Sequence, residues 1–247
     1  MKAVAITDTG LKRSINQDYV FCRDTKVGNL PNLFVVADGM GGHKAGDLAS
    51  RFTVDTLVSE IEKSDSDNPI SVIGDAIKTT NTKLIAKAAE SEDYAGMGTT
   101  LVVACVVDNS MYVANIGDSR LYVIDNQIRQ ITRDHSYVEE MVSLGKMSRD
   151  AKEYSAKKNI ITRAMGASDR VIPDFFEVDI CDDDVILMCS DGLTNMVDDE
   201  EIKDIIKMPE GIKHKAEMLV DEANNNGGRD NIAIIIIEPN IDEVSLC

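Results

Sequence analysis

Residues 33–42 read LFVVADGMGG, and the organisation of the chain can be worked out from this stretch. Its first five residues are apolar, and a short continuous apolar run predicts a buried strand. Asp38 and Gly39 follow at the exit of that strand. An Asp-Gly pair most often closes a hairpin as a type I′ turn. Here Gly41 and Gly42 lead instead into a segment with helical spacing, so Asp38 is predicted to stand at a strand end without closing a hairpin.

Four more aspartates stand beside apolar runs in a similar way. VILMCSDG at residues 185–192 places Asp191 just after a strand, and GGRDN at residues 227–231 places Asp230 just before the last one. Asp18 and Asp118 occupy comparable strand edges. The five carboxylates are therefore predicted to face one rim. Two carboxylates ~4 Å apart repel by about 4 kcal/mol at an effective dielectric constant of 20, so their convergence requires bound cations.

The ligand types at this predicted rim indicate which cations would bind. Carboxylates, a carbonyl at a glycine and water form an all-oxygen set, which selects Mg²⁺ or Mn²⁺ over zinc. The chain has three scattered histidines, with no H-E-x-x-H motif and no C-x-x-C pair, so a zinc site is disfavoured. Calcium is a weaker alternative, and the EF-hand loop pattern occurs nowhere.

The hydrophobic pattern predicts an α+β fold. Short polar breaks at residues 108–110, 117–118 and 125–126 favour an antiparallel meander. Strands grouped around paired helices, with few crossovers, predict two antiparallel β-sheets packed as a sandwich with helices on both outer faces, an α-β-β-α order. The strand-like stretches are residues 3–6, 19–22, 33–37, 99–107, 111–116, 119–124, 127–131, 175–180, 185–189 and 232–237. The helical stripes are residues 49–61, 73–88 and 212–223.

Length and charge narrow the function classes. A chain of 247 residues without a linker suits one domain, expected over residues 1–240 with a short tail at 241–247. Its net charge of −17 opposes binding to nucleic acid or to an anionic membrane surface. The longest apolar runs are far shorter than the ~20 residues of a membrane helix. The N-terminus meets Asp8 before a signal-peptide stretch develops, so we expect a cytoplasmic protein.

The sequence disfavours other known kinds of phosphate-binding and phosphate-transferring site. Residues 39–44, GMGGHK, lack the last glycine of the dinucleotide fingerprint, and no P-loop pattern is present. Cysteine phosphatases need an arginine six residues after the cysteine, and that offset gives no arginine here. The three aspartates at 182–184 precede their strand and are better interpreted as a solvated turn than as a phosphate-accepting nucleophile.

Seven motifs then occur in a recognisable order. They are GLKRSINQD at residues 10–18, VADGMGGH at 36–43, GMGTTL at 96–101, NIGDSR at 115–120, NIITRAMG at 159–166, SDGL at 190–193 and DNI at 230–232. With these motifs the chain resembles the metal-dependent PPM family of Ser/Thr protein phosphatases, protein phosphatase type 2C, and especially its compact bacterial members. One motif alone is a modest signal, but seven in family order over nearly the whole chain are a strong one.

The resemblance implies a set of metal ligands. Asp38 would bridge two Mn²⁺ or Mg²⁺ ions, Gly39 would offer its carbonyl to one of them, and Asp191 with Asp230 would bind the other. Bacterial members often hold a third ion, for which Asp118 and Asp191 match.

The resemblance also implies roles around these ions. Asp18 would act through water, as would Gln17, which stands where many members have Glu and would act more weakly. Arg13 would grip the substrate phosphate with a planar two-point clamp. Some members carry a histidine just after the Asp-Gly pair as the proposed general acid. That position is Met40 here, and His43 is an alternative. A flap would lie near residues 136–165, where the family's His-Pro pair is missing.

The implied activity is metal-dependent hydrolysis of phosphoserine and phosphothreonine in proteins. Such esters hydrolyse so slowly that enzymes supply accelerations approaching ~10²¹-fold, whereas a side-chain base supplies only about 10²- to 10⁴-fold. The resemblance therefore implies attack by a hydroxide that bridges two metal ions. We expect a monomer whose partners are phosphorylated proteins and a bacterial Ser/Thr kinase. Two alternatives stay open: a non-catalytic regulator that binds partners, and a partner-switching phosphatase of sigma-factor regulators.

Overall fold

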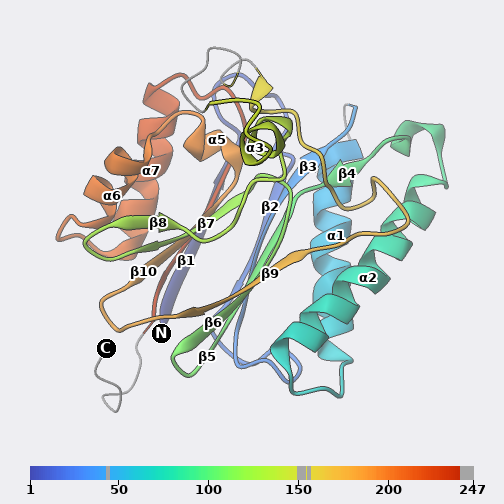
Figure 1. Cartoon of the computed structure of the whole chain (residues 1–247), viewed down its shortest axis with the longest axis horizontal. Helices are drawn as coiled ribbons and strands as arrows, with labels where there is room; N and C mark the ends of the chain where they lie inside the picture. The colour runs from blue at the N-terminus through green and yellow to red at the C-terminus, as the bar shows by residue number, and fades with distance from the viewer. Residues whose placement is uncertain (43–44, 149–153, 155–156, 240–247) are drawn as a thin grey trace.

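The computed structural model describes residues 1–42, 45–148, 154 and 157–239, and it has the predicted α-β-β-α architecture. Two antiparallel sheets lie face to face in the middle, with helices on both outer sides (Figure 1). His43 and the predicted tail at 241–247 lie outside the described residues. None of the helices in the described part of the chain combines the length and the apolar character that a membrane crossing needs.

One sheet contains β3, which runs through the Asp-Gly pair and ends at Met40, beyond the strand end predicted from the sequence. Its order is β2-β3-β5-β6-β9, with β4 paired to the end of β3. The antiparallel register of β2 and β3 sets Asp18 opposite Asp38. The strands are β2 (Asp18–Arg23), β3 (Leu33–Met40), β4 (Gly98–Thr99), β5 (Leu101–Val107), β6 (Ser110–Ile116) and β9 (Asp174–Asp179).

The second sheet carries the other two aspartates predicted at strand ends. Its order is β1-β11-β10-β7-β8. Because β10 and β11 are antiparallel, the end of β10 lies beside the start of β11, and Asp191 and Asp230 come to the same edge. The strands are β1 (Lys2–Asp8), β7 (Arg120–Ile124), β8 (Ile128–Gln130), β10 (Val185–Cys189) and β11 (Ile232–Glu238).

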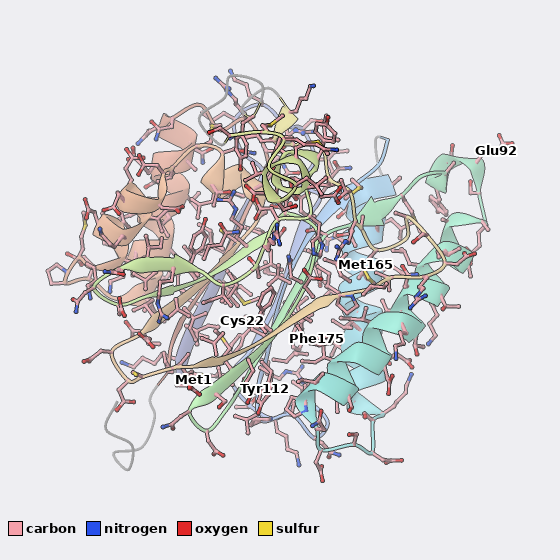
Figure 2. The ribbon with its side chains drawn as sticks, in the orientation of Figure 1. Met1, Cys22, Glu92, Tyr112, Met165 and Phe175 are labelled. Carbon is pink, nitrogen blue, oxygen red and sulfur yellow. The ribbon has the colours of Figure 1, made fainter. Side chains whose placement is uncertain are left out.

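Continuous apolar runs occur because both faces of each sheet are covered. In β11, Ile232, Ile234 and Ile236 pack toward the helices, while Ala233 and Ile235 pack between the sheets. Alternate residues of a strand point to opposite faces, so a doubly buried strand needs apolar residues at every position. Figure 2 shows side chains filling these layers, and the ring of Phe175 on β9 lies against Gly74 of the outer helix α2.

The helices divide between the two outer faces. Helices α1 (Ala45–Glu62) and α2 (Pro69–Ala88) cover the six-stranded sheet, and α6 (Asp199–Ile206) and α7 (Ile212–Asn225) cover the other. The predicted stripes at 49–61, 73–88 and 212–223 are confirmed as α1, α2 and α7. Within the described residues, the sequence did not predict η1 (Glu92–Tyr94), α3 (Tyr137–Ser143), α5 (Asp191–Thr194) or α6.

The predicted meander is wrong at residues 117–118. Strands β5 and β6 pair within the six-stranded sheet, whereas β7 and β8 belong to the five-stranded sheet. The chain crosses between the sheets at Gly117, whose φ is +105°. A Cβ on Gly117 would lie 2.7 Å from the side chain of Thr100, so glycine is needed there for both conformation and space. The crossing places Asp118 between the two sheets.

Candidate active site

The five predicted aspartates lie close enough together to affect one another's ionisation. The pKa of Asp38 is raised well above its ordinary value, first by burial and then by the charges of the other four aspartates. Asp18 and Asp38 come from one sheet, Asp191 and Asp230 from the other, and Asp118 from the crossing between them. The structure therefore brings together all five carboxylates that the sequence placed at one rim.

Burial makes three more of these carboxylates hold protons unusually tightly. Burial raises the pKa of Asp18 to about 7, and the charges of Asp191 and Asp230 add to this effect. The pKa of Asp118 also rises to about 7 and that of Asp191 to about 6, in both cases first through burial. A carboxylate with a raised pKa is one whose charge is poorly compensated by the protein alone. A divalent cation would supply that compensation.

The donor set at the rim fits a hard divalent cation. Asp18 Oδ1 is buried and makes no hydrogen bond within the described structure. Among the described residues, no three His, Cys, Asp or Glu side chains stand as a ready-made set for one ion. Mg²⁺ is usually bound by one or two carboxylates and keeps several waters. Pairs of carboxylates supplemented by main-chain carbonyls and water match that preference.

Hydroxyl groups that the sequence analysis did not single out hold Asp38 in place. The Asp38 N–H donates to Thr100 Oγ1 at 2.9 Å, and the Asp38 carbonyl accepts from the Thr99 hydroxyl and the Thr100 N–H, both at 2.9 Å. Thr100 Oγ1 also lies 2.7 Å from Ser119 Oγ, next to Asp118. A pair of buried hydroxyls thus connects the backbone at Asp38 with the crossing that carries Asp118.

Another buried hydroxyl, that of Ser190, connects the two sheets at Asp18. Ser190 Oγ donates to Asp18 Oδ2 at 2.6 Å and accepts the Ala233 N–H at 2.9 Å. Both Ser190 and Asp18 are almost fully buried. This hydrogen bond lowers the pKa of Asp18 and so opposes the effect of burial. Ser190 belongs to the SDGL motif, but nothing in its spacing identified it as a partner of Asp18.

Close backbone packing explains the glycine after Asp38. The Gly39 N–H donates to the Gln17 carbonyl at 3.0 Å. A Cβ on Gly39 would lie 2.0 Å from the carbonyl oxygen of Gly46 at the start of α1. Only glycine allows β3 and α1 to approach this closely. The side chain of Gln17 lies over Gly46, because a Cβ there would meet Gln17 Nε2 at 2.5 Å.

Arg13 lies at the solvent side of the rim. Its Nη2 donates to Asp230 Oδ2 at 2.8 Å, and half of its side chain is exposed. Asp230 also accepts its neighbour's N–H, from Asn231, at 2.8 Å through Oδ1. The arginine thus pairs with one of the predicted metal ligands through a single N–H donor.

His135 holds the chain in place at Gly117, where it crosses between the two sheets. Its Nδ1 accepts the Gly117 N–H at 3.1 Å, so the ring proton lies on Nε2, which faces Asp174 Oδ2 at 3.1 Å. Its backbone N–H donates to the Gly117 carbonyl, and its carbonyl accepts the Thr162 N–H at 2.8 Å. Burial lowers the pKa of His135, which favours this neutral form. His135 thereby connects the Asp118 crossing to both ends of residues 136–165.

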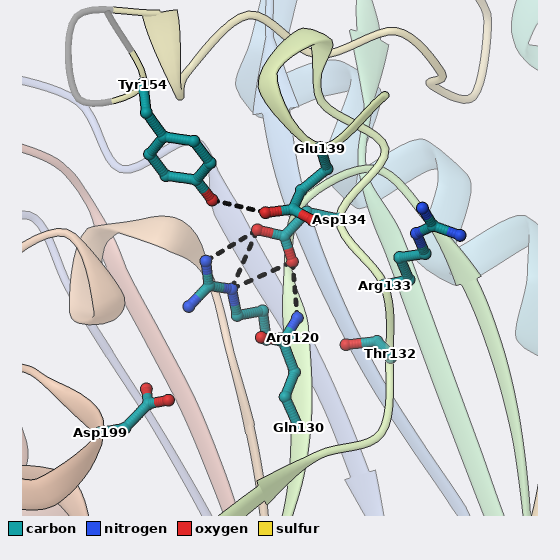
Figure 3. A pocket seen from close by; sticks show the side chains of 8 residues that line it. All are labelled: Arg120, Gln130, Thr132, Arg133, Asp134, Glu139, Tyr154 and Asp199. Atoms are coloured by element: carbon teal, nitrogen blue, oxygen red, sulfur yellow. Dashed lines mark hydrogen bonds and ion pairs between the residues drawn. The ribbon is translucent and has the colours of Figure 1, made fainter. Parts of the chain in front are cut away.

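Two polar cavities share Arg120, Asp134 and Tyr154, and the smaller of them reaches the rim. The larger one, about 410 Å³, contains the Arg120 guanidinium, which is bound by Asp134 through Nε and Nη2 (Figure 3). Across it, the Tyr154 hydroxyl donates to Glu139 Oε1 at 2.6 Å. A smaller cavity of about 130 Å³ shares Arg120 and Tyr154 and reaches Asp118 and Asp191. A polar space therefore extends from Asp118 and Asp191 to Tyr154, Lys158 and Asn159.

A sandwich of this topology, with aspartates from both sheets at one rim, defines the class of metal-dependent phosphatases. The profile of the family described as Protein phosphatase 2C matches residues 11–224, and the chain belongs to that family. Membership implies dependence on a divalent metal. The predicted roles of the individual residues in binding metal and phosphate stay predictions.

Named relatives and a solved structure agree with this family. The chain is 38% identical to the serine/threonine phosphatase stp of Listeria welshimeri, covering 98% of this chain and 97% of the relative. It is also 38% identical to the protein phosphatase PhpP of Streptococcus pneumoniae, covering 98% and 99%. The crystal structure of the serine/threonine phosphatase Stp1 from Staphylococcus aureus superposes with a TM-score of 0.87 at 38% identity, covering 96% of this chain and 94% of that one.

Proposed function

We propose that this phosphatase hydrolyses phosphoserine and phosphothreonine in proteins at the aspartate rim, using divalent cations that the rim holds. The observation that carries the proposal is the convergence of five carboxylates from two sheets, with raised pKa values at Asp18, Asp38, Asp118 and Asp191. Such a concentration of buried negative charge is costly unless cations occupy it. Perturbed carboxylates grouped at one place are also typical of functional sites.

The cations, when bound, would activate water at neutral pH and neutralise the charge of the phosphoryl group. We assign Asp38, with the Gly39 carbonyl, Asp191 and Asp230 to two Mn²⁺ or Mg²⁺ ions. Asp118 with Asp191 would hold a third, and Asp18 and Gln17 would act through water. The hydroxyls of Thr100, Ser119 and Ser190 keep these carboxylates in place.

Arg13 binds the substrate phosphate in this proposal. A guanidinium has five N–H donors in a planar fork, and one bond to Asp230 leaves the others available. Its half-exposed position lets the phosphate of a protein substrate reach it without entering a deep cavity. Arg13 would orient the ester so that phosphorus faces the rim, and bidentate contacts would fix that orientation.

The wider assignment follows from the same family. We propose one catalytic domain over residues 1–240, with a flap near residues 136–165, acting as a cytoplasmic monomer that opposes a Ser/Thr protein kinase. The relatives of matching length that support this assignment are named as serine/threonine phosphatases.

Phosphate release from a phosphothreonine peptide tests the proposal directly. We expect turnover with Mn²⁺, and a loss of at least about 100-fold in Asp38→Asn, together with weaker Mn²⁺ binding by calorimetry. Asp75→Asn, on the exposed face of α2, is the matched control and should keep both properties. Turnover that persists in excess chelator would refute the proposal, and an absence of divalent-cation binding would favour a non-catalytic regulator.

A further inference from the structure

A separate cavity of about 290 Å³ opens beside Asp230. Residues 158–160 form one wall, and Gly192, Met196 and Arg229 contribute to the others. Arg13 is not among its lining residues, so the cavity is distinct from the place where that arginine lies. Ligand pockets usually measure about 300–1,000 Å³. A cavity at the small end of that range suits one side chain of a bound protein better than a whole small molecule.

Two cations on its wall form no close ion pair within the described part of the chain. Neither Lys158 nor Arg229 takes part in an ion pair among the described residues, although the chain has 43 acidic residues. The one acid on the wall, Asp230, already accepts hydrogen bonds from Arg13 and from the Asn231 N–H. The wall therefore carries two cations that no carboxylate of the described residues binds in an ion pair.

Other cations lie near Lys158. Lys158 is partly buried, and burial lowers its pKa; the positive charges of Arg120 and Arg229 lower it further, and the charge of Asp191 opposes them. Like charges held together away from bulk water favour the binding of an anion. The apolar atoms of Met196 and Ile160 on the same walls fit the short aliphatic stem of an acidic side chain.

We propose that this cavity binds the carboxylate of an Asp or Glu that lies near the phosphorylated residue of the substrate, with Lys158 and Arg229 as its cationic partners. This inference rests on the proposed function and adds a substrate class to it, acidic phosphorylation sites. The shared wall at Asp230 places the cavity next to the reacting phosphate, within reach of a neighbouring residue of the same substrate chain.

The test compares peptides that differ only beside the phosphothreonine. Peptides carrying Asp, Ala or Lys within two residues on either side are hydrolysed by the wild-type enzyme with Mn²⁺, and the ratio of kcat/KM for Asp and Ala peptides is measured. Because a partly exposed ion pair contributes up to about 1 kcal/mol, we expect a preference for Asp of about fivefold. The preference should fall as ionic strength rises from 0.05 to 0.5 M, since salt screens such pairs.

Charge reversal makes the test sharper. Arg229→Glu should abolish the preference for Asp and shift it toward the Lys peptide, and Lys158→Ala should reduce it, each measured as a ratio within one variant. Lys157→Ala is the matched control, because Lys157 lies over the ring of Tyr137, 5.6 Å from its centre, and does not line the cavity. Melting curves establish that every variant folds.

The outcomes separate this inference from the proposed function. A wild-type enzyme that hydrolyses the Asp and Ala peptides equally well would overturn the inference and leave the phosphatase activity intact. A preference that survives Arg229→Glu unchanged would also overturn it. Failure to hydrolyse any of the peptides would instead count against the proposed function.

Discussion

Ser190→Ala probes how the two sheets are joined at the rim. The Ser190 hydroxyl is fully buried, donates to Asp18 Oδ2 at 2.6 Å and accepts the Ala233 N–H at 2.9 Å. Above the raised pKa of Asp18 the first of these bonds is made to a charged group, which contributes about 1.5–3 kcal/mol. The orphaned N–H of Ala233 costs about 1–3 kcal/mol more. The expected loss is therefore about 4 kcal/mol in the free energy of unfolding.

The assay is urea unfolding at pH 8 without metal, supported by thermal melting. For a domain of this size, 1 kcal/mol shifts Tm by about 2–4 °C, so Tm should fall by roughly 8–16 °C. Because the Ser190 hydrogen bond lowers the pKa of Asp18, its loss should also move the midpoint of Mn²⁺ binding to higher pH.

A matched serine separates this effect from the loss of any hydroxyl. Ser143 donates to the Glu140 carbonyl on the exposed face of α3, and Ser143→Ala should change stability by less than about 0.5 kcal/mol. If Ser190→Ala stays within 1 kcal/mol of the wild type and keeps the same pH midpoint, then the hydroxyl does not hold Asp18 as described.

Two further predictions concern the charge and the packing of the rim. The pKa values of Asp18 and Asp118 rise from 3.8 to about 7, so the folded protein binds more protons than the unfolded chain between about pH 4 and 7. Metal-free protein should therefore lose stability as pH rises through that window, and Mn²⁺ should raise Tm more at pH 8 than at pH 5; equal shifts in differential scanning fluorimetry would contradict this. Gly39→Ala would push a Cβ to 2.0 Å from the Gly46 carbonyl oxygen, and calorimetry should show at least tenfold weaker Mn²⁺ binding with about 1–3 kcal/mol lower stability. Gly211→Ala, where a Cβ meets nothing within 4 Å, should leave the binding unchanged.

The sequence was most informative where local pattern and tertiary environment agree. The run at 232–237 predicted β11 because a strand covered on both faces must be apolar throughout, and it extends by only one residue to Glu238. The aspartates were predicted to meet because each flanks a buried strand, and antiparallel pairing then brings such ends to one edge. Their individual roles toward metal stay predictions, since pattern does not determine which oxygen atoms face one ion.

Other features depend on contacts that no local pattern contains. In sequence, Gly117-Asp118 resembles a hairpin turn. In the structure the chain crosses to the other sheet there, and Gly117 contacts Thr100 and His135, which are distant along the chain. A lone serine at 190 carries no periodic signal that would pair it with Asp18. In contrast, α6 could have been predicted from the sequence, because Asp198 and Glu201 form a capping box at the start of that helix and its apolar stripe.

The origin of the carboxylates in two different sheets has a consequence for how the protein folds. Neither sheet by itself holds more than half of the predicted ligands, so a partly folded chain with only one sheet formed has no complete centre. High-affinity capture of Mn²⁺ during refolding should therefore coincide with the docking of one sheet on the other. The rate of Mn²⁺ binding would then report the rate of the last step of folding.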